Sequence, residues 1–230
     1  MELTTKNIEQ LYKFTKDHFV DWYDLQTELV DHLANDIEEI WKKNPSISFE
    51  TARDISFKKF GIFGFGDIVE QKQNALSKHY WKEVLKEFVQ FFRLPKIILT
   101  VFFCIGTYSL FSYFNNGYFI FSLIFLTTAI YPMFRLYKHV WRVKRRNKSN
   151  NKSWQLDGII YQTAFFPYIV LCPYSTIVDL FFKPSFTPNQ LIFFSVSLVL
   201  FSLLFYVSTE IVSPNMQKKM VKLFPDYAIV

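Results

Sequence analysis

Four long apolar stretches occupy the second half of the chain. They cover residues 97–114, 118–136, 158–182 and 190–212, and polar segments separate them. At 1.5 Å of rise per helical residue, the first stretch gives a helix of roughly 27 Å, close to the thickness of the hydrocarbon layer. The pattern therefore predicts a transmembrane domain over residues 93–230 with four membrane-spanning helices.

Residues 1–92 instead show the spacing of amphipathic helices. An opening helix is indicated by Ile8, Leu11, Tyr12 and Phe19. A second helix, over residues 21–43, carries apolar side chains at spacings of three and four: Leu25, Leu29, Leu33, Ile37, Ile40 and Trp41. Asn44 and Pro45 end it. This region is therefore predicted to be a small helical domain.

Capping residues place two more helices before the apolar stretches. Ser48 is a typical N-cap for a short helix, and Gly61 suits its C-terminal end. Asp67 and Glu70 resemble a capping box that opens a long helix reaching to Pro95. The apolar face of that helix carries Trp81, Leu85, Phe88 and Phe92. This face either lies along the membrane interface or packs on the small domain. The expected fold class is all-α.

The charges divide sharply between the two regions. Residues 1–92 hold twelve Lys and Arg against sixteen Asp and Glu, residues 93–230 hold fourteen against four, and the whole chain carries +6. An excess of positive charge is also typical of nucleic-acid-binding proteins. Here the excess flanks the apolar stretches, so membrane orientation explains it better and no nucleic-acid partner is expected.

A basic stretch between the second and third apolar stretches sets the expected topology. It runs from Arg135 to Lys152, is predicted to be a loop, and is expected to be flexible over 148–153. The segments expected inside hold thirteen Lys and Arg, whereas the two outer loops hold only Lys183. This bias predicts a multi-pass protein of the bacterial inner membrane with both termini in the cytoplasm. Four residues are expected to hold this topology and attract anionic lipid headgroups: Arg142, Lys144, Arg145 and Arg146.

The start of the chain is polar from Met1 to Lys6 and lacks the apolar run of a signal peptide. The N-terminal region is therefore expected to stay on the cytoplasmic side.

The predicted helix over residues 21–43 carries the candidate partner-binding residues. These are Glu28, Asp31, His32 and Asp36, of which Glu28, His32 and Asp36 fall four apart on one helical face. Such a face binds a partner protein, faces solvent, or contributes to a divalent-metal site. Because no second ligand-bearing segment is evident, we predict a partner-binding surface and no metal site.

Other chemistry is sparse in the sequence. The glycines of segment 61–66 lack the Lys-Ser/Thr pair of a phosphate-binding loop, so this segment is expected to turn the chain and fill the small core. Asp179 and Glu210 are the only carboxylates inside the apolar stretches, and both lie near a stretch's end. Cys104 and Cys172 have no metal-ligand spacing. No catalytic or cofactor-binding residues are expected.

Residues 20–75 resemble a known family of small bacterial modules. The segments that carry the resemblance are Glu28-Leu29-Val30-Asp31-His32-Leu33, Ser48-Phe49-Glu50-Thr51-Ala52 and Phe60-Gly61. They are similar to the HAAS or permease-prefix domains, helical cytoplasmic modules that commonly precede membrane segments. The resemblance implies a protein-interaction or signalling role and supplies no catalytic residues.

These observations favour a non-enzymatic regulatory or accessory protein of the inner membrane. Its N-terminal module would dock a cytoplasmic or membrane protein, and its basic residues would contact anionic lipid. Two alternatives stay open. A transporter or permease component would need a polar path through the spans. A membrane enzyme acting on lipid or peptide would need a cluster such as His139 with Asp157 or Glu210.

Overall fold

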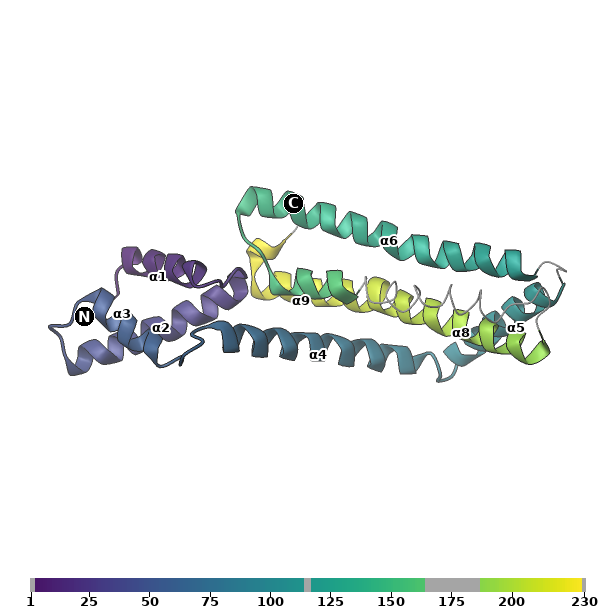
Figure 1. Ribbon diagram of the computed structural model, residues 1–230, viewed down its shortest axis with the longest axis horizontal. Helices are drawn as coiled ribbons and strands as arrows, with labels where there is room; N and C mark the ends of the chain where they lie inside the picture. The colour runs from purple at the N-terminus through teal and green to yellow at the C-terminus, as the bar shows by residue number, and fades with distance from the viewer. Residues whose placement is uncertain (1–2, 114–116, 164–186, 229–230) are drawn as a thin grey trace. The chain divides into compact units, whose positions relative to one another are not determined.

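The computed structural model describes residues 3–113, 117–163 and 187–228 (Figure 1). In these ranges the chain is almost entirely helical and forms no β-strand. It divides into two units. The first contains Met1–Lys78 together with Asn147–Gly158, and the second contains His79–Arg146 together with Ile159–Val230. The all-α prediction is thereby confirmed.

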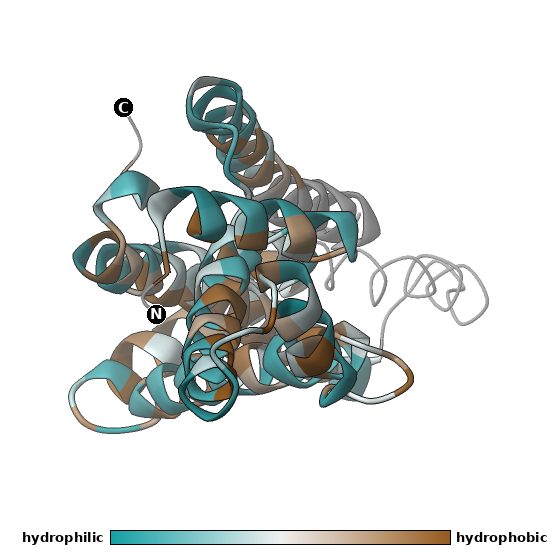
Figure 2. Ribbon diagram, turned by 90° about the vertical axis from the view of Figure 1, so that its left-hand side faces the viewer, coloured by the Kyte–Doolittle hydropathy of each residue, from teal (hydrophilic) through white to brown (hydrophobic). Residues whose placement is uncertain are grey.

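The first unit is built on α2, which spans Tyr23–Lys43 and packs against α1, Thr5–Asp17, and α3, Phe49–Lys58. The long helix α4, Gly66–Gln90, begins in this unit. The core consists of fully buried apolar side chains of these elements, including Leu11, Leu29, Leu33, Ile37, Ala52 and Phe65. Polar side chains lie on the opposite faces, as the hydropathy colours of the helices show (Figure 2), so the predicted amphipathic spacing is what assembles the unit.

Local capping follows the sequence closely in the first unit. The Ser48 hydroxyl accepts a hydrogen bond from the Thr51 backbone N–H at 3.2 Å, which confirms the predicted N-cap. Gly61 lies just beyond α3 with φ of +83°, a left-handed conformation that glycine adopts without strain. Gly64 has φ of +55°, and a Cβ there would lie 2.8 Å from the Phe57 ring. The glycine segment therefore turns the chain, as predicted.

Three apolar residues of this unit lie elsewhere than expected. Helix α1 ends at Asp17, and Phe19 follows it with φ of +64° and 89% of its surface exposed. This turn brings Val20, rather than Phe19, into the core. In the glycine segment Phe65 fills the core, but Ile62 and Phe63 are exposed. Period alone did not distinguish these residues from their neighbours, because a chain reversal changes which side chain faces inward.

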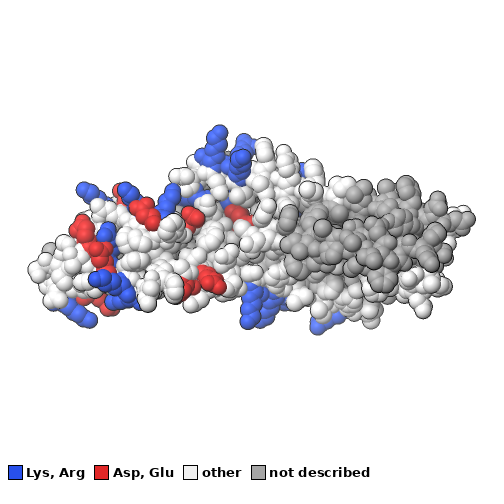
Figure 3. Space-filling model, viewed as in Figure 1, with Lys and Arg blue, Asp and Glu red and all other residues white. Residues whose placement is uncertain are grey.

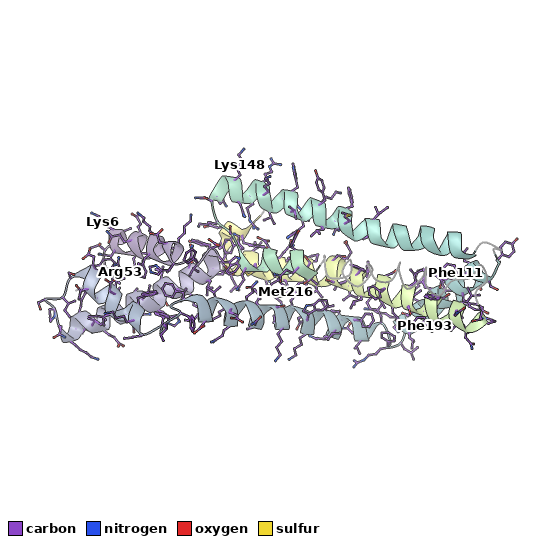
Figure 4. The ribbon with its side chains drawn as sticks, viewed as in Figure 1. Lys6, Arg53, Phe111, Lys148, Phe193 and Met216 are labelled. Carbon is purple, nitrogen blue, oxygen red and sulfur yellow. The ribbon has the colours of Figure 1, made fainter. Side chains whose placement is uncertain are left out.

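The second unit contains the long apolar helices. Helix α5 spans Lys96–Tyr113 and packs against α8, Pro188–Tyr206, which continues through a π-helical turn, Val207–Val212, into α9, Ser213–Leu223. Two helical stretches, Lys96–Tyr113 and Pro188–Leu223, are long and apolar enough to cross a membrane. Large apolar side chains lie exposed on them, such as Phe102 on α5 and Phe193 on α8 (the latter labelled in Figure 4), as expected of helices that face lipid.

These two helices coincide with the predicted spans 97–114 and 190–212. The predicted span 118–136 falls inside a longer helix, α6, which covers Gly117–Asn150. Of the predicted span 158–182, only residues up to 163 belong to the described part of the chain, and these are helical. The structure therefore supports two spans by length and composition, and the four-span arrangement stays a prediction.

The basic stretch is helical, contrary to the prediction of a loop. Helix α6 continues through Arg142 and Arg146 to Asn150, and Lys148 projects from its end (Figure 4). Lys and Arg are good helix formers, and no Gly or Pro interrupts residues 133–150. Positive charge indicated where this segment lies relative to the membrane, but it did not distinguish a loop from a helix.

Candidate functional site

The predicted docking residues of α2 divide into two pairs. The Glu28 carboxylate forms an ion pair with Lys72 of α4, and the Asp36 carboxylate accepts hydrogen bonds from Ser56 at 3.0 Å and Lys59 at 2.9 Å. Burial raises the pKa of Asp36, but these bonds outweigh it and hold the pKa below its ordinary value. Glu28 and Asp36 therefore fasten neighbouring segments to α2.

The other pair lies on the same exposed side of the helix as Glu28, whose carboxylate is 4.0 Å from the His32 imidazole. Asp31 and His32 are exposed, and the His32 side chain keeps 65% of its surface accessible. Asn35 and Glu39 are exposed on this side as well. We call Asp31, His32, Asn35 and Glu39 the α2 face. Asp31 and Glu39 make this face polar and mainly acidic, and Lys, Arg, Asp and Glu side chains are interspersed over the surface of the first unit (Figure 3).

The segment that follows α6 folds into the first unit. The Tyr23 backbone N–H donates a hydrogen bond to the Ser153 carbonyl at 2.8 Å. The Trp154 ring packs edge-on against the Tyr23 ring with 5.4 Å between centroids, and only 1% of Trp154 is exposed. The Lys152 ammonium lies 3.8 Å from the centroid of the same tyrosine ring. Residues 151–155 and 22–24 thus form an ordered junction, which we call the α2 clamp, where the sequence predicted a flexible loop.

A half-buried carboxylate completes the α2 clamp. Asp24 accepts a 3.4 Å hydrogen bond from the Gln155 backbone N–H. Burial raises the pKa of Asp24 above its ordinary value, and the nearby Asp157 carboxylate raises it further, although the backbone donors oppose this shift. The α2 clamp therefore makes Asp24 harder to ionise than a free aspartate.

The second unit contains a polar cavity of about 130 Å³. The side chains around it come from α4, α6, the helical segment 155–163, the π-helical turn and α9. Its polar lining includes Tyr80, Arg135, His139, Arg142, Ser208 and Gln217. None of the described residues that line it is acidic. Polar groups thus converge here from α4, from α6 and from the continuous stretch formed by the π-helical turn and α9.

The π-helical turn shapes one wall of the cavity. The Ser208 carbonyl in this turn accepts a 3.0 Å hydrogen bond from the Tyr80 hydroxyl of α4. Tyr80 is almost fully buried, and burial raises its pKa to about 12, so the phenol stays a neutral donor. Wider helical turns of this kind are rare and occur often at functional sites.

An ion pair joins the same π-helical turn to α6. Arg135 approaches Glu210 at 2.6 Å, and the Tyr131 hydroxyl donates to the same carboxylate at 2.9 Å. Glu210, one of the two carboxylates noted inside the apolar stretches, thus pairs with Arg135 and accepts a hydrogen bond from Tyr131. Asp179, the other, lies outside the described residues.

The four basic residues predicted to contact headgroups occupy different surroundings. Arg142 lines the cavity, whereas Lys144 and Arg145 are exposed, with Arg145 over the Trp141 ring. Arg146 is 4% exposed, and its guanidinium lies 4.5 Å from the centroid of Tyr227. Only Arg142 of the four therefore combines access with an enclosed polar environment.

Sequence reasoning named Arg142, His139 and Glu210 near this site but missed Tyr80, Ser208 and Gln217. Helical periodicity relates residues one turn apart, so it carried no signal that α4, α6 and α9 meet. Within the described ranges, no three His, Cys, Asp or Glu side chains gather as a metal site would require. Comparisons with protein families, curated proteins and solved structures find no match to this chain.

Proposed function

We propose that this protein is a regulatory or accessory subunit of the bacterial inner membrane, with both termini in the cytoplasm. Its N-terminal unit, for which we keep the proposed likeness to permease-prefix modules, docks a partner protein through the α2 face. The membrane helices anchor the unit and receive its signal. The proposed role is non-enzymatic, and it requires no chemical step from the described site residues.

The α2 clamp is the observation that carries this proposal. Because residues 147–158 belong to the first unit, the chain passes between the two units three times, near residues 78, 146 and 158. A docking module tethered by one linker would move independently of the membrane helices. In the α2 clamp, the chain that links α6 to segment 155–163 is held against the start of α2.

The α2 face supplies the docking surface. Leu29, Leu33 and Ile37 are buried on the inner side of α2, so Asp31 and His32 project away from the core. Asp31 makes neither the Lys72 nor the Lys59 ion pair, so replacing it should leave both pairs and the core packing in place. Partner contacts can therefore be tested without unfolding the unit.

Site-specific photo-crosslinking in native membranes tests the docking role. A photoreactive residue at position 31 or 35 should capture one and the same protein, and one at the exposed Glu9 of α1 should not. Asp31→Lys should abolish the crosslink from position 35, whereas Glu9→Lys, the same charge change on another helix, should leave it intact. Equal capture from positions 9 and 35, or an unaffected crosslink in Asp31→Lys, would refute docking at this face.

The proposed topology has its own test. Reporters joined at Val230 and inserted near Ser149 should both be active only as cytoplasmic fusions. Periplasmic activity at either position would overturn the orientation and, with it, the cytoplasmic placement of the α2 face.

A further inference from the structure

We infer that the cavity beside the π-helical turn binds the phosphate group of an anionic phospholipid. This inference rests on the membrane placement within the proposed function but is independent of partner docking. Charge alone would attract headgroups to any basic surface. The inference is more specific, because it names one partly open cavity and, of the two arginines that line it, the one that Glu210 does not neutralise.

The lining of the cavity suits a phosphate. Guanidinium groups bind phosphate oxygens through paired, charge-assisted hydrogen bonds, and hydroxyl and amide groups donate further ones. Two guanidinium nitrogens of Arg135 already contact the Glu210 carboxylate, and the negative charge of Glu210 offsets the positive charge of Arg135. Arg142 is therefore the residue that gives the cavity a net positive charge. The serine and threonine hydroxyls and the Gln217 amide supply neutral donors around it.

The size of the cavity selects a small group. Its volume of about 130 Å³ is close to the roughly 150 Å³ of an engineered cavity that binds benzene. A phosphate and its first ester atoms fill a space of this order, whereas a nucleotide or a folded peptide segment does not fit. The fatty-acyl chains of a bound lipid would have to remain outside.

The position of the lining residues favours a lipid source over a soluble one. Leu136 lies at the inner end of the predicted span 118–136, Ile160 at the start of 158–182, and Ser208 near the end of 190–212. In the proposed topology all three lie at the cytoplasmic edge of the hydrocarbon layer. Phospholipid phosphates occupy this depth.

Native mass spectrometry of the full-length chain in a neutral detergent tests the inference. The probes are short-chain phosphatidylglycerol, the matching diacylglycerol without phosphate, and inorganic phosphate with glycerol phosphate as soluble competitors. Wild-type protein should bind one phosphatidylglycerol per chain in preference to diacylglycerol. Arg142→Gln should weaken this binding by about tenfold or more, the usual effect of losing a charge-assisted hydrogen bond.

Lys138→Gln is the matched control. Lys138 lies one turn earlier on α6, is exposed over the Phe134 ring, and does not line the cavity. General electrostatic attraction predicts equal losses for both variants, whereas the cavity predicts a loss only for Arg142→Gln. Equal losses, unchanged binding in Arg142→Gln, or equal binding of diacylglycerol would overturn the inference. Displacement by soluble phosphates at the concentration where the lipid binds would overturn the lipid source.

A second variant guards against misfolding of Arg142→Gln. Gln217→Leu keeps the side-chain volume and the net charge but removes an amide from the cavity, and it should weaken binding by about fivefold. Thermal unfolding without lipid should be the same for all variants. Because the assay contains no protein partner, a failed docking experiment does not affect its outcome.

Discussion

Trp154→Ala is the most direct test of the α2 clamp. In the native chain, Trp154 is buried between the end of α6 and Tyr23, and no other side chain of residues 151–153 contributes comparable apolar area. Truncation to alanine removes the ring contact but leaves the Tyr23–Ser153 backbone hydrogen bond possible. The change therefore tests whether side-chain packing, rather than backbone pairing alone, orders the α2 clamp.

The expected magnitude follows from the buried area. A tryptophan side chain buries 150–250 Å², which at about 25 cal/mol per Å² corresponds to roughly 4–6 kcal/mol as an upper bound. Measured truncations of buried aromatic residues cost about 3–5 kcal/mol. Because each 1.4 kcal/mol is tenfold in an equilibrium, opening of the α2 clamp should become at least a hundredfold more frequent.

Hydrogen–deuterium exchange of the full-length protein in neutral detergent measures this opening. Peptides covering residues 20–30 and 147–158 should exchange much faster in Trp154→Ala, whereas peptides from α5 should not change. Trp141→Ala provides the control, since Trp141 is 55% exposed on α6 and its loss should leave both regions protected. Unchanged protection of residues 20–30 in Trp154→Ala would show that the α2 clamp does not order the start of α2.

Three further predictions concern the stability of the first unit. Gly64→Ala should lower the free energy of unfolding of this unit by about 1–3 kcal/mol, because Gly64 has a positive φ and lies close to the Phe57 ring. Gly66→Ala is the control and should not lower it, because the space around Gly66 is open. Thermal unfolding of the two variants distinguishes these outcomes. Asp36→Ala should cost about 1–3 kcal/mol at pH 7, because a buried hydroxyl loses its acceptor. Since the folded pKa of Asp36 is lowered, its contribution is present above pH 3.8 and disappears as the pH falls through the folded pKa, so unfolding curves of wild type and variant should converge in acid. For Asp24 the folded pKa is raised, so its contribution to stability is complete below pH 3.8 and is lost as the pH rises through the folded pKa. Asp24→Asn should therefore raise the thermal unfolding midpoint at pH 7. An unchanged midpoint would contradict a destabilising, desolvated carboxylate at this position.

Local patterns predicted the helices of this protein well. The 21–43 helix, the Ser48 cap and the spans 97–114 and 190–212 all depend on residues within one or two turns of each other. Their interactions are therefore visible as periodicity or as a cap. The exposed Phe19 marks the limit of this reasoning, because the left-handed turn that sends Val20 inward leaves no periodic trace.

The α2 clamp and the cavity were not predictable in the same way. The Tyr80–Ser208 hydrogen bond and the Tyr23–Trp154 contact join residues more than a hundred positions apart. The residues next to each of these four positions in the sequence give no indication of the distant partner. The polar composition of residues 148–153 indicated an exposed, flexible loop. The neighbouring Trp154 is buried instead, and its large aromatic side chain holds this part of the chain in place.

The two inferred activities share one stretch of chain. Arg142 contributes to the cavity and Lys152 to the α2 clamp, and α6 covers most of the sequence between them without interruption. Beyond the α2 clamp, Ile160 returns to the cavity within about two helical turns of Trp154. Lipid in the cavity would contact α6, and the same helix leads into the α2 clamp, which holds the start of α2.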